Sequence, residues 1–235
     1  MSMFCFQCQE AAKNEACTVR GVCGKTPEVA NLQDLLIWLL KGISFWGTRA
    51  RNLGVNDPET NLFVAEALFA TVTNVNFDSD RFVELIREAV ERRDALRAPA
   101  QAVCRAQHGE PCSANLPEMA AWTPKTYDAA ALALMGRSVG VMADPDLDPD
   151  IRSLRELIVY GLKGLAAYTD HAYVLEHTND DLLAFIQEAL DATTDDSLTG
   201  DDLVGWVMKT GEMGVESMRL LDEANTGTYG HPEPT

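Results

Sequence analysis

Apolar residues along most of the chain recur at the three- and four-residue spacing of an amphipathic helix. The clearest run follows residue 27, where six apolar residues share one helical face: Leu32, Leu35, Leu36, Leu39, Leu40 and Ile43. A stripe with this period buries one side of a helix against a core. No convincing stretch alternates apolar and polar residues as a half-buried strand does. The pattern therefore predicts an all-α protein with few or no strands.

Helix starts are marked by a capping side chain placed before a proline. This pair occurs at Thr26-Pro27, Asp57-Pro58 and Asp148-Pro149. Threonine and aspartate accept hydrogen bonds from the unpaired N–H groups of a first turn, and proline suits the first helical position. We therefore expect helices to begin at these three prolines.

The helical pattern occurs twice along the chain. LQDLLIWLLKG, from Leu32, matches LRELIVYGLKG, from Leu154, at an offset of 122 residues, and FVAEALFAT, from Phe63, matches FIQEALDAT, from Phe185, at the same offset. Identical pairs include Leu35 and Leu157, Lys41 and Lys163, Gly42 and Gly164, Glu66 and Glu188, and Thr71 and Thr193. An offset this long is not a solenoid repeat and indicates a duplicated helical module.

Each copy of the module is expected to contain three helices, giving two tandem three-helix bundles. The third helices are predicted from about Asp80 to Arg97 and from about Asp201 to Asp222. Residues 1–27 form an N-terminal cysteine loop, 28–97 the first bundle and 151–224 the second bundle. Residues 98–150 form a connector with short helices, one from Tyr127 to Arg137, and 225–235 a linker-like tail. Mid-helix glycine is unfavourable, so Gly42 and Gly164 predict a helix crossing in both copies.

Composition narrows the classes of function. The net charge is −17, which repels phosphate backbones and argues against nucleic-acid binding. Apolar residues make up 46% of the chain, enough for a sizeable core, but no run of eighteen occurs, so we expect no membrane span. The N-terminus lacks the features of a signal peptide, which favours a cytoplasmic protein. We interpret the acidic run from Asp144 to Asp150 as a solvated turn, because it lacks the glycine and glutamate of a calcium loop.

Four of the six cysteines lie close together near the N-terminus. Cys5, Cys8, Cys17 and Cys23 give the pattern C-x2-C-x8-C-x5-C. In a reducing compartment such a group is more often a metal site than a disulfide framework. The spacing favours an iron–sulfur cluster, with zinc second because only the first pair has a zinc hook, and cysteines without metal third. Nearby, Gly21 and Gly24 free backbone N–H groups for hydrogen bonds to sulfur, and Arg20 and Lys25 could offset the charge.

A second group, Cys104, His108 and Cys112, has the spacing C-x3-H-x3-C. Gly109 and Pro111 interrupt the helix on which such residues would share a face, and no fourth ligand is evident. We expect these cysteines to be structural, and their role stays open. His171 occupies the repeat position of Arg49, which predicts a surface or interface role. No histidine lies in a catalytic motif.

Several segments closely resemble hybrid-cluster proteins, the hydroxylamine reductase family. They are MFCFQCQEAAKNEACTVRGVCGKTPEVANLQDLLIWLLKGIS, FATVTNVNFD, SVGVMA, IRSLRELIVYGLKG and LLDEANTGTYGHPE. The resemblance covers nearly the whole chain and implies a first domain of two three-helix bundles. It also implies that Cys5, Cys8, Cys17 and Cys23 ligate a [4Fe-4S] cluster, since members with longer gaps carry [2Fe-2S].

The same resemblance implies partners. Family members continue into two α/β catalytic domains, which hold the hybrid cluster where hydroxylamine or nitric oxide is reduced, and the ligands of that cluster are missing from this sequence. We therefore expect an electron-transfer domain that relays electrons from a redox donor protein, with no catalytic residue of its own. Two alternatives stay open: part of a complete reductase whose catalytic domains are missing or on another chain, and a non-redox helical module with a structural zinc.

Overall fold

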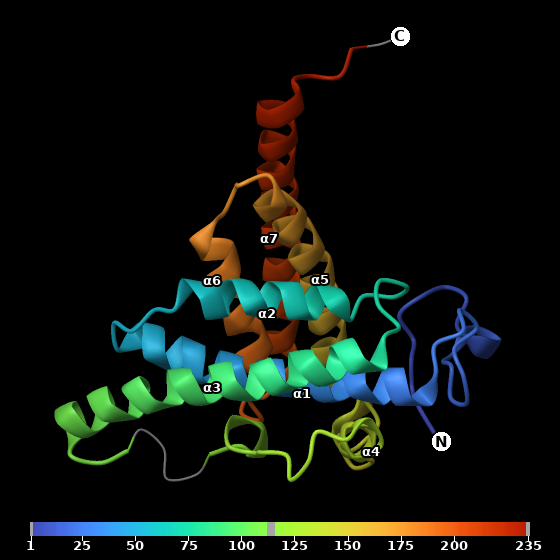
Figure 1. The fold of residues 1–235 in the computed structure, drawn as a ribbon, viewed down its shortest axis with the longest axis horizontal. Coiled ribbons are helices and arrows are strands. Elements are labelled where there is room, and N and C mark those ends of the chain that lie inside the picture. Colours follow the sequence, from blue (N-terminus) through green and yellow to red (C-terminus); the bar gives the residue numbers. More distant parts are fainter. Residues whose placement is uncertain (1, 112–115, 234–235) are drawn as a thin grey trace.

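The computed structural model describes residues 2–111 and 116–233, which form helices joined by short loops (Figure 1). The α-helices are α1 (Pro27–Asn52), α2 (Pro58–Ala70), α3 (Ser79–His108), α4 (Ala129–Val139), α5 (Pro149–Val174), α6 (Asp180–Ala192) and α7 (Gly200–Tyr229). Two short 3-10 helices, η1 (Ala12–Asn14) and η2 (Glu118–Ala120), complete the described ranges, which contain no strand. The predicted all-α fold is confirmed. No helix in these ranges is both long and apolar enough to cross a membrane.

Helix lengths confirm the internal duplication. Helices α1 and α5 both have 26 residues, α2 and α6 both have 13, and α3 and α7 both have 30. The first two pairs keep the offset of 122, whereas α3 and α7 start 121 residues apart, at Ser79 and Gly200. We refer to α1–α3 as copy one and to α5–α7 as copy two.

The three predicted caps are present. Thr26 Oγ1 accepts a hydrogen bond from Val29 N at 3.2 Å, and Asp57 Oδ1 accepts one from Thr60 N at 3.0 Å. Asp148 Oδ1 accepts from Asp150 N at 2.9 Å, and its neighbours Asp144 and Asp146 are exposed. The acidic run is therefore a solvated turn that ends in a helix cap, as expected.

The third helix of each copy is longer than predicted. Helix α3 continues through Pro99 to His108, and α7 continues to Tyr229, into the predicted tail. Proline removes one backbone donor, but the residues around Pro99 are strong helix formers and Ala100 is buried. Within residues 98–108 only Ala100 and Cys104 are buried, so these two side chains anchor an otherwise mostly exposed extension of the helix.

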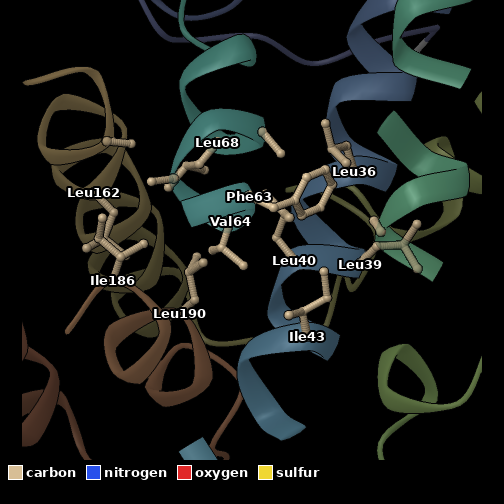
Figure 2. Close-up of a cluster of buried hydrophobic side chains, with 14 of the residues drawn as sticks. Leu36, Leu39, Leu40, Ile43, Phe63, Val64, Leu68, Leu162, Ile186 and Leu190 are labelled. Atoms are coloured by element: carbon tan, nitrogen blue, oxygen red, sulfur yellow. The ribbon is translucent and has the colours of Figure 1, made fainter. Parts of the chain in front are cut away.

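The two copies share one apolar core. Helix α1 packs against α6 as well as α3, and α2 packs against α5 and α6. Figure 2 shows Leu40 and Val64 of copy one facing Ile186 and Leu190 of copy two. One cluster of buried side chains extends through both copies. In Figure 1 the helices of copy one lie across the view while α5 and α7 run up it, so the copies cross and interlock.

The connector between the copies folds back over α1 and α3. Trp46 Nε1 donates a hydrogen bond to Ala120 O at 2.9 Å, and the buried guanidinium of Arg93 donates to Met119 O at 3.2 Å. A Cβ at Gly42 would collide with the Met119 carbonyl, so the glycine is needed for this approach. Helix α4 packs on α1 in the same manner, with Gly136 against the backbone of Asn31.

The helix crossing predicted at both glycines is therefore only partly correct. The close neighbour of Gly42 is η2 of the connector, which is a short 3-10 turn. At Gly164 the prediction is wrong, because a Cβ there would have no atom within 4 Å. The same residue in the same helix is covered in one copy and open in the other.

Candidate metal centre

The N-terminal loop positions its first and third cysteines next to each other. Cys5 N donates to Cys17 O at 3.1 Å, and Cys17 N donates to Cys5 O at 2.8 Å, which forms an isolated antiparallel bridge. Cys17 is buried with Met3 and Ala30, whereas Cys5 is half-buried at the edge of this small cluster. The loop is thereby attached to the first turn of α1.

The other two cysteines lie on turns of the same loop. Cys8 O accepts a hydrogen bond from Ala11 N at 3.1 Å, and Cys23 is exposed within a turn closed by Gly21 N donating to Lys25 O at 2.9 Å. Gly24 has a φ of +95°, a conformation that favours glycine, and a Cβ at Gly21 would lie 3.1 Å from Cys23 Sγ. Both glycines therefore shape the turn that carries Cys23.

The chemistry of this donor set fits a thiolate-ligated metal group. Cys5, Cys8, Cys17 and Cys23 are all free thiols on one segment. Their side chains are not gathered around one point: within residues 2–111 and 116–233 no three His, Cys, Asp or Glu side chains form a metal-binding group. Folding of such loops is commonly coupled to metal ligation, and the free energy of metal binding brings the ligand side chains together. The assignment of these four residues as ligands stays a prediction.

Of the two cations expected near the cysteines, one is buried and the other is exposed. Lys25 Nζ donates to Gln33 Oε1 at 2.7 Å and lies 5.8 Å from the centre of the Phe77 ring. The side chain of Arg20 is exposed to solvent. Lys25 therefore places a fixed positive charge behind the cysteine loop, and Arg20 adds a screened one at the surface.

A cavity of about 420 Å³ lies against the cysteine loop. Its walls come from the loop at Phe4–Gln7, from α1, from α5 and from residues 138–147 of the connector. Tyr160 of α5 donates its hydroxyl hydrogen to Gln7 O at 3.2 Å, which fixes the loop to copy two. The cavity is therefore lined by both copies and by the segment that carries Cys5.

Four charged residues in the cavity wall form two equivalent pairs of the duplication. Asp34 corresponds to Glu156, and Lys41 corresponds to Lys163, each at the offset of 122. Burial raises the pKa of Asp34 from 3.8 to about 7, against the opposing charge of Lys163. Burial lowers the pKa of Lys163 from 10.5 to about 8, against the opposing charges of Asp34, Glu156 and Cys5. Burial also lowers the pKa of Lys41, and this effect exceeds the opposing effect of the Glu156 charge.

Sequence reasoning missed this charged group as a site. Its one signal was the identity of Lys41 and Lys163 within the matching LLKG and GLKG segments. A lysine retained on a mostly apolar helix in both copies indicates a buried charge with a partner on another helix. This charged group lies close enough to the cysteine loop for Cys5 to raise the pKa of Lys163.

The second cysteine group is only partly within the described residues. Cys104 is buried on α3, His108 is exposed at its last turn, and Gly109 ends the helix with a φ of +80°. Cys112 lies outside the described residues. The helix break expected at Gly109 is confirmed, and the role of the group stays open.

The surface or interface role expected for His171 is confirmed, because the residue is exposed and contacts the other copy. Its ring packs edge-on against Phe69 of α2, with centroids 5.4 Å apart. The equivalent residue Arg49 forms an ion pair with Asp191 of α6 at 3.0 Å. Since Asp191 is the repeat equivalent of Phe69, the same contact between copies occurs twice with different chemistry.

Comparison with known proteins identifies the family of the chain. Residues 3–235 match the family described as the Prismane/CO dehydrogenase family. The hydroxylamine reductase of Halothermothrix orenii is 54% identical over 235 residues, which are all of this chain and 42% of that protein. Those of Petrotoga mobilis and Nitratidesulfovibrio vulgaris are 52% and 51% identical, and the matches cover 43% and 41% of their lengths. The chain thus spans less than half the length of these relatives, and it belongs to the Prismane/CO dehydrogenase family.

Proposed function

We propose that the chain is the iron–sulfur electron-transfer domain of a hybrid-cluster protein, with Cys5, Cys8, Cys17 and Cys23 as ligands of one [4Fe-4S] cluster. The observation that carries the proposal is the presence of four free thiols on one loop of a chain of this family. When bound, such a cluster accepts and donates single electrons at a potential set by nearby charges, hydrogen bonds and solvent exposure.

The surroundings of the loop support this role. Met3 and Ala30 exclude water from the Cys17 side, and the buried ammonium groups of Lys25 and Lys163 offset negative charge from behind. Cys23 is exposed, which leaves one side of the loop accessible to a redox donor protein. The recipient of the electrons is the remainder of a longer protein, where the α/β catalytic domains reduce hydroxylamine or nitric oxide. A cytoplasmic location is part of the proposal and rests on the sequence alone.

A second candidate is that the chain acts only as part of a complete hydroxylamine reductase. It is favoured by the name of the relatives, hydroxylamine reductase, and by the 42% of their length that the chain spans. In this candidate the chain has no activity alone and gains hydroxylamine or nitric oxide reduction only with the missing domains. No residue of this chain is assigned a catalytic role in either candidate.

The test is the iron, sulfide and zinc content of protein purified without oxygen, together with its visible spectrum. We expect about four iron and four sulfide per chain and a broad brown absorbance, as a four-thiolate cubane requires. Cys8→Ser is expected to lose most of this content, whereas Cys104→Ser, outside the loop, is expected to retain it. One zinc without sulfide would overturn the redox proposal and favour a structural zinc.

A further inference from the structure

An apolar face of copy two, on the outer side of α5 and α7, is open to solvent. We call this the open face, and define it by six residues: Leu157, Gly164, Tyr168, Met208, Val215 and Met218. The exposed fractions of its large side chains are 50% for Leu157, 41% for Tyr168, 65% for Met208, 70% for Val215 and 56% for Met218. Single exposed apolar residues are ordinary, but a row of them along two packed helices indicates a binding surface.

On α1, copy one contains the equivalent of the α5 part of this face in a covered form. Leu35, Gly42 and Trp46, the equivalents of the α5 residues, are buried. The connector covers them through Gly136 of α4 beside Leu35, Met119 beside Gly42, and the hydrogen bond from Trp46 to Ala120 O. On α3 the cover is partial: Arg87, the equivalent of Met208, stays exposed, and its guanidinium lies 4.5 Å from the centre of the Tyr127 ring of the connector.

The contrast between the copies indicates what covers the open face. In copy one the cover is the polypeptide that follows the third helix. In copy two, the exposed α7 residues replace charged residues of α3 with apolar ones: Arg87 by Met208, Asp94 by Val215 and Arg97 by Met218. An apolar side chain at a position that stays in water adds no stability. The same side chain stabilises a contact from which water is excluded.

We propose that the open face is the docking surface for the part of a longer family member that this chain does not span. That part makes up more than half of relatives such as the Halothermothrix orenii protein. A second copy of this chain is a poorer occupant, because each copy carries a net charge of −17 and the two repel. This inference deepens the proposed function by naming where its partner docks, and rests on it only for the existence of that partner.

Methionine oxidation tests the surface directly. In one protein this chain replaces the matched region of the Halothermothrix orenii relative, and it is compared with the 235-residue chain alone by hydroxyl-radical footprinting. We expect Met208 and Met218 to oxidise at least about fivefold more slowly in the longer protein, because the centre of an interface excludes water. Met142, in the connector and 41% exposed, is the control and is expected to oxidise equally in both.

A pair of matched variants gives a second readout. Met218→Glu and Leu134→Glu both introduce a charge at an exposed apolar helix position. We expect neither to change the urea midpoint of the chain alone, and only Met218→Glu to lower that of the longer protein. Carbene footprinting of the intact relative adds a measurement that does not depend on the hybrid: the peptide aligned with residues 208–218 should label weakly.

Three results would overturn the proposal. One is equal oxidation of Met208 in both proteins, with strong labelling of the aligned peptide in the intact relative. Another is an equal loss of stability from both glutamate variants in the longer protein. The third is a concentration-dependent dimer of the chain alone that protects Met208 and Met218, which would identify a second copy as the occupant. Iron and sulfide, measured in the same samples, report on the cluster separately, so the two proposals can fail independently.

Discussion

Gly42 and Gly164 are equivalent residues whose surroundings differ, which makes them a matched pair for mutation. Gly42→Ala places a methyl group against the Met119 carbonyl, and we expect it to lower the free energy of unfolding by about 1–3 kcal/mol, the usual cost of overpacking. Gly164→Ala meets open space and is expected to raise it by about 0.5–1 kcal/mol, because alanine is the better helix former. Urea unfolding followed by circular dichroism measures both, and changes of the same sign would contradict the covering of α1 by the connector.

Asp34 should make stability depend on pH. Burial raises its pKa from 3.8 to about 7, so the folded protein holds a proton in this range that the unfolded chain has released. The contribution of Asp34 to stability is therefore greatest at or below about pH 4 and is lost as the pH rises to about 7. Asp34→Asn removes this loss, so the stability of the variant relative to the parent should increase between these pH values and then level off.

Urea midpoints at half-unit pH intervals measure the effect. Asp146→Asn, at an exposed position of the acidic turn, is the control and should give a difference from the parent that stays constant across this range. A constant difference for Asp34→Asn as well would mean that the cavity wall leaves this carboxyl solvated.

The candidate site was predictable only where its residues form a motif. The spacing of Cys5, Cys8, Cys17 and Cys23 is local, and can be recognised from the loop alone. Asp34 and Lys163 come from different helices of different copies, and their proximity depends on how α1 and α5 cross. Periodicity identifies the buried side of a helix, but it cannot identify which charged residue on another helix will face it.

At the scale of elements, helix starts and the repeat were predictable because their causes are local. The capping side chains before Pro27, Pro58 and Pro149 act within one turn, and the offset of 122 recurs in the helices. The ends of α3 and α7 were predicted too early, at about Arg97 and Asp222, whereas the helices continue to His108 and Tyr229. Buried side chains continue past both predicted ends, with Ala100 on α3 and Ala224 on α7, and the sequence pattern does not report these tertiary contacts.

The cap of α5 can be tested against its own neighbour. Asp148→Ala removes the acceptor for the N–H groups of Asp150 and Ile151, and we expect a loss of about 1 kcal/mol in the free energy of unfolding. Asp146→Ala, two residues earlier, alters an exposed side chain outside the cap and should change it by less than about 0.5 kcal/mol. Urea titration of both variants gives the comparison. Equal effects would show that net charge, and not the cap, is responsible.

At the scale of the whole molecule, the repeat suggested boundaries near residues 97 and 151 between two bundles. The packing joins the copies across those boundaries, because α2 contacts α5 and α1 contacts α6. A duplicated sequence shows that two modules have the same helices, but it does not show whether each module buries its own core. Here the buried side chains form one cluster, and the hydrogen bonds from Arg51 to Gln187 and from Gln187 to Asn61 cross between the copies.

One shared core predicts one unfolding transition. Leu190 of α6 is fully buried among residues of both copies, so Leu190→Ala should lower the free energy of unfolding by about 2–5 kcal/mol. In a Trp206→Phe background the remaining tryptophans, Trp38, Trp46 and Trp122, report only copy one and the connector. Because the copies share a core, the tryptophan fluorescence and the far-ultraviolet circular dichroism should shift to the same lower urea midpoint.

Leu134→Ala, at an exposed position of α4, is the control and should leave both midpoints unchanged. If Leu190→Ala shifted the circular dichroism and left the fluorescence midpoint in place, the copies would be unfolding as separate bundles.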